Sequence, residues 1–510
     1  MKKILWSITY LVMLNISVFG QNIEFKAIIA DEETKEPLIG ATLRFEGLEK
    51  GGATDANGMV TIQNIPVGEY EIQISYIGYE ELETTIYITE NMETPTFYLE
   101  QSGEELEEVV VSTTRSTRTI QNIPTRVETI GLEELGEKAI MNSSNISMVL
   151  RESTGIQIQQ SSLSSGDRSI RIQGLDGRYT QLLKDGFPLY GGFSGGLSIM
   201  QIPPLDLNQF EIIKGSSSTL YGGGAIAGLI NMVSKTPKEE PTLDIMLTQT
   251  QALGSTANIF YGQRKGKIGY TLYGSGYYQS PYDPDGDDFT NLPQTTSFSL
   301  NPKLFYYPSE NTTFWIGLNG TYDDRKGGDL TLIKDGVNGE HQFSEYNNTV
   351  RVSSQAVFEH QVSDNKSLQI KNSVAYFDRG LTTPNLTFSG SQWNSFTELN
   401  YSIQNEKSDW IFGANVYSND FREQDATLPR NQKDITTGIF ANNITDLSEQ
   451  LILESGFRMD YAADWGIFPL PRVSLLWKVN ENFSSRLGGG LGYKIPDSFT
   501  EDAAVLNYAG

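Results

Sequence analysis

The sequence predicts a mainly β protein with an N-terminal β-sandwich, a central α+β domain and a transmembrane antiparallel β-barrel. Three observations support this fold class. Short alternating segments fill residues 22–100, helix and strand signals mix over 123–235, and segments of about ten alternating residues repeat from 243 onward. No segment after the N-terminus is a run of about 20 apolar residues, the length that a spanning helix needs. We therefore expect strands to make any membrane crossing.

Residues 1–20 have the pattern of a secretory signal peptide. Lys2 and Lys3 precede an apolar run over 4–19, and Gly20 is small enough to stand before a cleavage site. The apolar run is too short for a membrane anchor. The chain has no cysteine, which excludes disulfides and a lipid-modified N-terminal cysteine.

Composition excludes two classes of function. The chain has 63 acidic and 38 basic residues, a net charge of -25, which disfavours nucleic acid as a partner. It has only two histidines, His341 and His360, and neither lies in a motif that supplies a nucleophile and a base. We therefore expect no enzymatic activity.

Residues 21–100 are predicted to form the β-sandwich. Strand-like segments alternate with turn signals such as "TDANG" at 54–58. The order of "PLIGATL", "TDANGMVTI" and "IPVGEYEIQISYIGYE" resembles the carboxypeptidase regulatory-like domain found at the N-terminus of many Bacteroidetes secreted proteins. A generic immunoglobulin-like spacer is the alternative.

Residues 101–119 are interpreted as a linker that contains a short strand. An acidic run at 104–108 precedes a β-branched triplet and a serine, and the four residues of this strand are Val109, Val110, Val111 and Ser112. Such a segment can add to the edge of a partner's sheet. A plain linker is the alternative.

The stretch "YGGGAIAGLINMVSKTP" at 221–237 matches the spacing of a dinucleotide-binding fingerprint at Gly222, Gly224 and Ala227. That site requires a buried strand before the glycines and a helix after them. Here the preceding residues are polar, and "AIAGLINMVSK" is typical of a strand. We therefore interpret the glycines as structural.

Residues 120–236 resemble the plug domain of TonB-dependent outer-membrane receptors. The resemblance lies in "VLRESTGIQI", "RSIRIQGL", "LLKDGFPL" and "IPPLDLNQFEIIKGSSSTLYGGGAIAGLINMVSKTP". It implies that residues 109–112 are the TonB box, which pairs with TonB of the TonB–ExbB–ExbD complex. It also implies a cell outer membrane location, with the N-terminal domain in the periplasm.

The same resemblance implies ligand contacts at the outward plug loops 161–168, 175–179 and 190–197. Arginines there can pair with anionic groups of a ferric siderophore, and aromatic side chains can add contact area. Packing of the loops alone is the other interpretation. The ligand-binding residues implied are Arg168, Arg178, Tyr179, Tyr190 and Phe193. The plug-to-barrel contacts implied are Arg171, Lys214 and Glu501, although Gln173 stands where the family usually has arginine.

Residues 237–510 are predicted to form a lipid-embedded barrel. About 13 alternating segments are joined in turn by short connections such as "SDN" and by long ones such as 280–294 and 323–347. The family's barrel has about 22 strands, so we expect the chain to hold the N-terminal part of the barrel and to continue beyond Gly510.

The cargo class follows from the resemblance alone. An iron-siderophore complex is the leading candidate, ahead of cobalamin, another metal chelate or an oligosaccharide. A non-transporting structural or adhesive barrel is the remaining alternative. No cofactor is expected, except that Asp283, Asp285 and Asp287 copy the start of a calcium loop. A solvated acidic loop is the simpler interpretation of these three residues.

Overall fold

A computed structural model describes residues 22–496, with gaps at 33, 49, 77–78, 90–91, 101–110, 161, 163, 191–197, 338, 425, 427–428 and 481–482. The chain divides into two compact units, Met1–Val109 and Val110–Gly510. The expected signal peptide lies outside the described residues.

The first unit is the predicted β-sandwich. A three-stranded sheet, in the order β4-β1-β7, and a four-stranded sheet, in the order β3-β2-β5-β6, share one apolar core around Ile29, Phe45 and Ile72. The alternating pattern of the sequence places these side chains on the inner faces. The strands are β1 (Asn22–Asp31), β2 (Thr42–Phe45), β3 (Lys50–Ala53), β4 (Met59–Pro66), β5 (Gly68–Ser75), β6 (Leu82–Ile88) and β7 (Thr96–Leu99).

The second unit begins with an α+β domain, here called the inner domain (residues 111–234). Its five-stranded sheet has the order β12-β11-β14-β13-β8, and β9 and β10 form a separate hairpin. The strands are β8 (Val127–Ile130), β9 (Ile156–Gln160), β10 (Arg168–Ile172), β11 (Thr180–Lys184), β12 (Phe187–Tyr190), β13 (Leu207–Lys214) and β14 (Gly228–Ser234). The helices are α2 (Leu132–Met141), α3 (Ser147–Arg151) and α4 (Ser218–Tyr221), with 3-10 turns η1 (Ser112–Thr114), η2 (Ile120–Asn122), η3 (Gly177–Tyr179) and η5 (Ser198–Gln201).

Strand β14 explains the glycine-rich stretch. The glycines are followed by this strand, as the β-branched residues predicted, and not by the helix that a dinucleotide site requires. Gly228 has φ +146°, and a Cβ there would collide with the carbonyl oxygen of Ile213 on β13. Only glycine therefore allows β13 and β14 to pair at this point.

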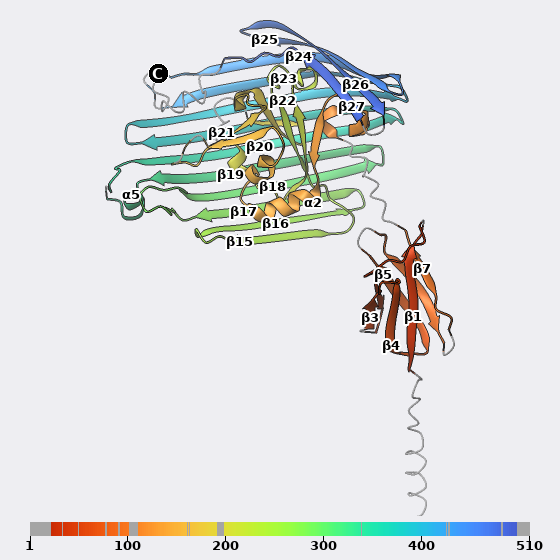
Figure 1. Ribbon diagram of the computed structural model, residues 1–510. Helices are drawn as coiled ribbons and strands as arrows, with labels where there is room; N and C mark the ends of the chain where they lie inside the picture. Colours follow the sequence, from red (N-terminus) through yellow and green to blue (C-terminus); the bar gives the residue numbers. More distant parts are fainter. Residues whose placement is uncertain are drawn as a thin grey trace, which may run out of the picture. The chain divides into compact units, whose positions relative to one another are not determined.

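The rest of the second unit is one 13-stranded antiparallel sheet in which every strand pairs with its neighbours in the sequence. The inner domain lies against one face of this curved sheet (Figure 1). Its strands are β15 (Thr242–Gln249), β16 (Gly254–Lys265), β17 (Ile268–Gln279), β18 (Gln294–Ser309), β19 (Thr312–Gly328), β20 (Ser344–Ser363), β21 (Lys366–Thr383), β22 (Leu386–Asn405), β23 (Ser408–Gln424), β24 (Gln432–Ser448), β25 (Leu451–Ala462), β26 (Gly466–Asn480) and β27 (Phe483–Gly490). Helix α5 (Leu330–Asp335) lies between β19 and β20.

The two faces of this sheet have opposite character. Large apolar side chains such as Ile316 and Leu318 on β19 are about half exposed, whereas Asp323 and Arg325 on the same strand are buried. An apolar outer face and a polar inner face are the arrangement of a barrel in lipid. None of the described helices has the length and apolar character to cross a membrane.

Candidate functional site

The chain enters the inner domain through a packed tail segment, residues 111–118. Val111 is fully buried in an aliphatic cluster, and Ser112 begins a 3-10 turn. Val109 and Val110 lie outside the described residues. Strand pairing of this segment with TonB stays a prediction, and it requires Val111 and Ser112 to leave the inner domain.

Glu211 on β13 holds the tail segment. This side chain is fully buried and accepts hydrogen bonds from the backbone N–H of Ser112 at 2.8 Å and of Thr113 at 3.0 Å. It also accepts from the Ser112 hydroxyl at 2.9 Å, from Asn231 at 3.0 Å and from Gln209 at 2.8 Å. Five donors surround a carboxylate that forms no ion pair with a described residue. A buried carboxylate without a cation requires such donors.

Two arginines of the tail segment pair with acids of the sheet. Arg115 lies 2.8 Å from Glu398 on β22, and both side chains are less than a tenth exposed. Arg118 lies 2.8 Å from Asp409 on β23 and also pairs with Asp446 on β24. Residues 101–119 were expected to form a linker, and these ion pairs were not predicted. The only local signal is the repeat of arginine in "STTRSTRT".

The predicted plug-to-barrel residues have other surroundings. Lys214 pairs with Glu128 and donates to the carbonyl of Thr154, and all three residues belong to the inner domain. Arg171 lies on β10, opposite Gln157 of β9. Glu501, the expected barrel acid, lies outside the described residues. Among the described residues, Lys214 therefore has its ion pair within the inner domain.

The turn after β11 makes a further contact with the sheet. Asp185 lies 2.5 Å from Lys303 on β18, and its two oxygens also accept from the backbone and hydroxyl of Ser234. Burial alone would raise the pKa of Asp185, but Lys303 and Lys184 outweigh it and hold that pKa below its usual value. The contact therefore persists as an ion pair at neutral pH.

The apex loop (residues 164–168) lies at the opposite end, near the long connections. Asp167 is buried, with an oxygen 3.6 Å from Nη2 of Arg379 on β21. Arg325 on β19 donates to the carbonyl of Ser165. Burial raises the pKa of Asp167 to about 6, although Arg379 and Arg325 oppose the shift. The apex loop thus meets two arginines of the sheet.

Arg168 adds a third positive charge at the apex. It donates to the Ser147 hydroxyl at 2.9 Å and forms no ion pair with a described residue. Burial lowers its pKa, and repulsion from Arg325 and Arg151 lowers it further. A guanidinium group without an acidic partner can bind an anion.

The other predicted ligand residues are only partly described. Arg178 is 44% exposed at its side chain and stacks over the ring of Tyr179, 4.9 Å from its centroid. The side chain of Tyr190 and the whole of Phe193 lie outside the described residues. The structure describes only the side chains of Arg168, Arg178 and Tyr179 among the five predicted residues, and a shared role in ligand binding stays a prediction.

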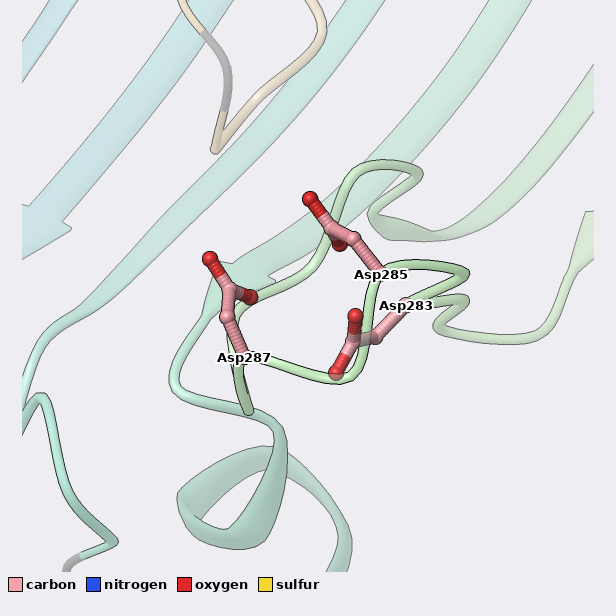
Figure 2. Close-up of side chains that lie close together, drawn as sticks. All are labelled: Asp283, Asp285 and Asp287. Carbon is pink, nitrogen blue, oxygen red and sulfur yellow. The ribbon is translucent and has the colours of Figure 1, made fainter.

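The acidic triad lies in the connection between β17 and β18. The carboxylates of Asp283, Asp285 and Asp287 lie within 4.8 Å of one another (Figure 2), and Asp285 and Asp287 are exposed. Asp288 has φ +62°, the left-handed conformation that a calcium loop gives to glycine at this position. The backbone at this position therefore has the conformation of a calcium loop, although Asp288 stands where such loops have glycine.

Two of the three carboxylates, those of Asp283 and Asp287, already accept backbone hydrogen bonds. Asp283 accepts from the N–H groups of Gly286 and Asp288, and these donors lower its pKa. Asp287 accepts from Phe289 N–H at 2.9 Å. The geometry is that of a self-closed turn, so calcium binding stays a prediction.

Two family models match the chain. Residues 28–111 match the CarboxypepD_reg-like domain, and residues 119–229 match the TonB-dependent Receptor Plug Domain. The first match covers the sandwich, and the second covers most of the inner domain.

Curated relatives extend the similarity into the sheet. The vitamin B12 transporter BtuB of Vibrio cholerae is 22% identical over 428 residues, which are 80% of this chain and 66% of the relative. The iron-regulated outer membrane virulence protein of the same species is 24% identical over 414 residues, or 76% of this chain and 60% of the relative. The chain thus spans less than two thirds of the length of these relatives.

Solved structures show the same fold. A variant of the ferric enterobactin receptor PfeA from Pseudomonas aeruginosa has a TM-score of 0.59 at 15% identity, covering 76% of this chain and 64% of its own. The siderophore receptor PirA from Acinetobacter baumannii has a TM-score of 0.57 at 17% identity, covering 74% and 62%. At such low identity these likenesses establish the architecture of the inner domain and the surrounding sheet.

Proposed function

The chain belongs to the TonB-dependent receptors, and on that premise we propose that it imports a scarce ligand across the outer membrane into the periplasm. The single observation that carries the proposal is an inner domain held within the sheet by ion pairs at the tail segment. Because the inner domain fills the space beside the sheet, an energy source must displace part of it before a ligand can pass. The tail segment is the point at which a partner protein can pull on the inner domain.

The two ends of the second unit differ, and the difference supports one orientation of the unit in the outer membrane. Arg118 pairs with Asp409 and Asp446 close to the short turns, whereas Asp167 meets Arg379 close to the long connections. In outer-membrane barrels the short turns face the periplasm. We therefore infer that the N-terminal domain is periplasmic, that TonB of the TonB–ExbB–ExbD complex pairs with residues 109–112, and that ligand arrives at the apex loop.

An iron-siderophore complex is the proposed ligand class. The arginines around the apex loop suit an anionic ligand, and both solved structures named above are siderophore receptors. Cobalamin or another metal chelate is the second candidate, because a vitamin B12 transporter is among the relatives. We propose no enzymatic activity.

Uptake by cells tests the proposal. A strain lacking the gene is compared with one that expresses the chain, on a panel of ferric siderophores and on cobalamin. A Val110→Pro variant removes an amide donor from the proposed pairing strand, and Gly103→Pro in the same stretch is the matched control. We expect siderophore uptake with the chain and with the control, and none with Val110→Pro. Uptake of cobalamin but of no siderophore would make cobalamin the ligand. Equal uptake in all strains, including the strain that lacks the gene, would favour a structural barrel that transports nothing.

A further inference from the structure

The two sheets of the sandwich have four edge strands, which differ in how well they are protected against pairing with another strand. Strands β3 and β6 border one sheet, and β4 and β7 border the other. An edge strand presents unpaired backbone groups to other chains, so natural proteins shorten, bulge or charge such strands.

Three of the four edges are protected. Strands β3 and β7 have only four residues each, and Pro95 directly precedes β7. Strand β4 carries a bulge with Asn64 at φ +59° and ends at Pro66. Lys50 donates to two carbonyl groups of β4, those of Gln63 and Asn64. Each device is one that blocks strand addition.

Strand β6 has none of these devices. Its seven residues, "LETTIYI", pair with β5 from Gly68–Ile88 to Ile74–Leu82 without a register shift. The strand contains no proline, glycine, lysine or arginine and is rich in β-branched residues. Among the described residues, no backbone hydrogen bond joins 82–88 to any segment other than β5. A regular strand with one free edge is a template for another strand.

The outer face beside this edge is acidic. Glu83 on β6 is exposed, and Glu71 and Glu69 on β5 lie opposite Thr85 and Tyr87. The three glutamates form no ion pair with a described residue. The ring of Tyr87 is 62% exposed next to them. Like charges on the same face are destabilising unless a cation approaches.

We propose that the free edge of β6 binds a basic, extended segment of another protein as an added strand. Lysine or arginine at alternate positions would face the glutamates, and apolar residues between them would cover the half-buried Leu82 and Thr84 on the core side. A second copy of this chain is a poor occupant, because two β6 edges would bring two rows of glutamates together. The inference concerns the sandwich and does not depend on the transported ligand.

A designed peptide tests this edge. The probe is a nine-residue peptide of alternating lysine and valine with a terminal cysteine. Its controls are a block-ordered peptide of the same composition and a version with glutamate in place of lysine. Because the chain has no cysteine of its own, Tyr87→Cys on β6 and the exposed Thr61→Cys on β4 report the position of the peptide by disulfide formation with the purified full chain.

We expect the alternating cationic peptide to cross-link to the Tyr87→Cys variant about tenfold more than to Thr61→Cys, with weaker binding at high salt. Glu71→Gln with Glu83→Gln should weaken binding about fivefold without lowering the melting temperature. Thr84→Lys, an inward lysine at the edge, should abolish it. Equal cross-linking at both positions, equal binding of the acidic or block-ordered peptide, or a disulfide dimer of the Tyr87→Cys variant without peptide would each overturn the proposal.

Discussion

At the tail segment the charges of the inner domain are matched, since Arg118 contacts both Asp409 and Asp446. At the apex loop they are not, since Arg168 forms no ion pair with a described residue and is repelled by Arg325. Matched buried pairs are costly to break one partner at a time, whereas a guanidinium group without an acidic partner can still pair with an anion. The comparison teaches that both arginines of the tail segment are paired with acids of the sheet, whereas Arg168 at the apex loop has only a hydroxyl partner among the described residues.

The largest effect is expected from breaking the tail fastening. Arg115→Ala removes the ion-pair partner of the buried Glu398 and leaves it with Lys371 and two amide donors, which should destabilise the folded unit by about 3 kcal/mol. Arg422→Ala is the matched control, because its pair with Asp420 is 70% exposed on the arginine side and solvent screening should leave it with little effect on stability. Thermal unfolding of the full chain in detergent measures both. Equal destabilisation by Arg115→Ala and Arg422→Ala would show that the ion pairs of the tail segment contribute no more than an exposed pair.

Replacing the acid that holds the tail backbone should act more locally. Glu211→Gln keeps the shape but weakens the bonds from Ser112 and Thr113 by about 2 kcal/mol, or about 30-fold in local opening. Hydrogen exchange at those two amides should quicken while exchange in β14 is unchanged. Glu133→Gln, on an exposed position of α2, should change neither. Unchanged exchange at Ser112 would show that Glu211 does not hold the tail segment.

The apex should respond to pH. The unfolded chain titrates Asp167 near pH 4, whereas burial raises its folded pKa to about 6. The unfolded state therefore loses its proton first, and the free energy of unfolding falls as pH rises from about 4 to about 6, by about 3 kcal/mol at most, and is constant above. Asp167→Asn should remove that part of the slope, as seen in denaturant titrations of both proteins. A slope that Asp167→Asn leaves intact would assign the pH dependence to other groups.

The smallest effect is expected at the acidic triad. Its oxygens already accept backbone hydrogen bonds, so millimolar calcium should raise the free energy of unfolding by only about 1 kcal/mol. Asp287→Asn should halve or abolish that gain, and magnesium serves as the control ion. A gain of several kcal/mol would make the loop a built calcium site, and no gain would leave it a solvated turn.

The alternation of apolar and polar residues predicted the strands of the sheet and strand β14. The alternating segments after residue 243 became thirteen paired strands, and the β-branched run after the glycines became β14. Strand ends were less predictable, because β19 runs on to Gly328 and β20 begins at Ser344, inside the long connection expected over 323–347. The polar residues there still pair with the neighbouring strand.

The site was less accessible to sequence reasoning. Arg118 and Asp446 are separated by 328 residues, and no period or motif connects them. Lys214 was expected to face a barrel acid but pairs with Glu128, which only the pairing of β13 with β8 brings near. Helix α2 was also missed, because its glycine and glutamates weakened the apolar pattern.

The strictly sequential order of the sheet has a consequence for the timing of assembly. Each strand from β15 to β27 can pair as soon as its predecessor is in place, since all of its partners are neighbours in the chain. The contacts of the inner domain follow a different schedule, because Arg118 meets Asp409 and Asp446 only once β23 and β24 have formed. The tail segment is thus synthesised before every strand of the sheet but reaches the ion-pair partners of Arg118 only after β24 has formed.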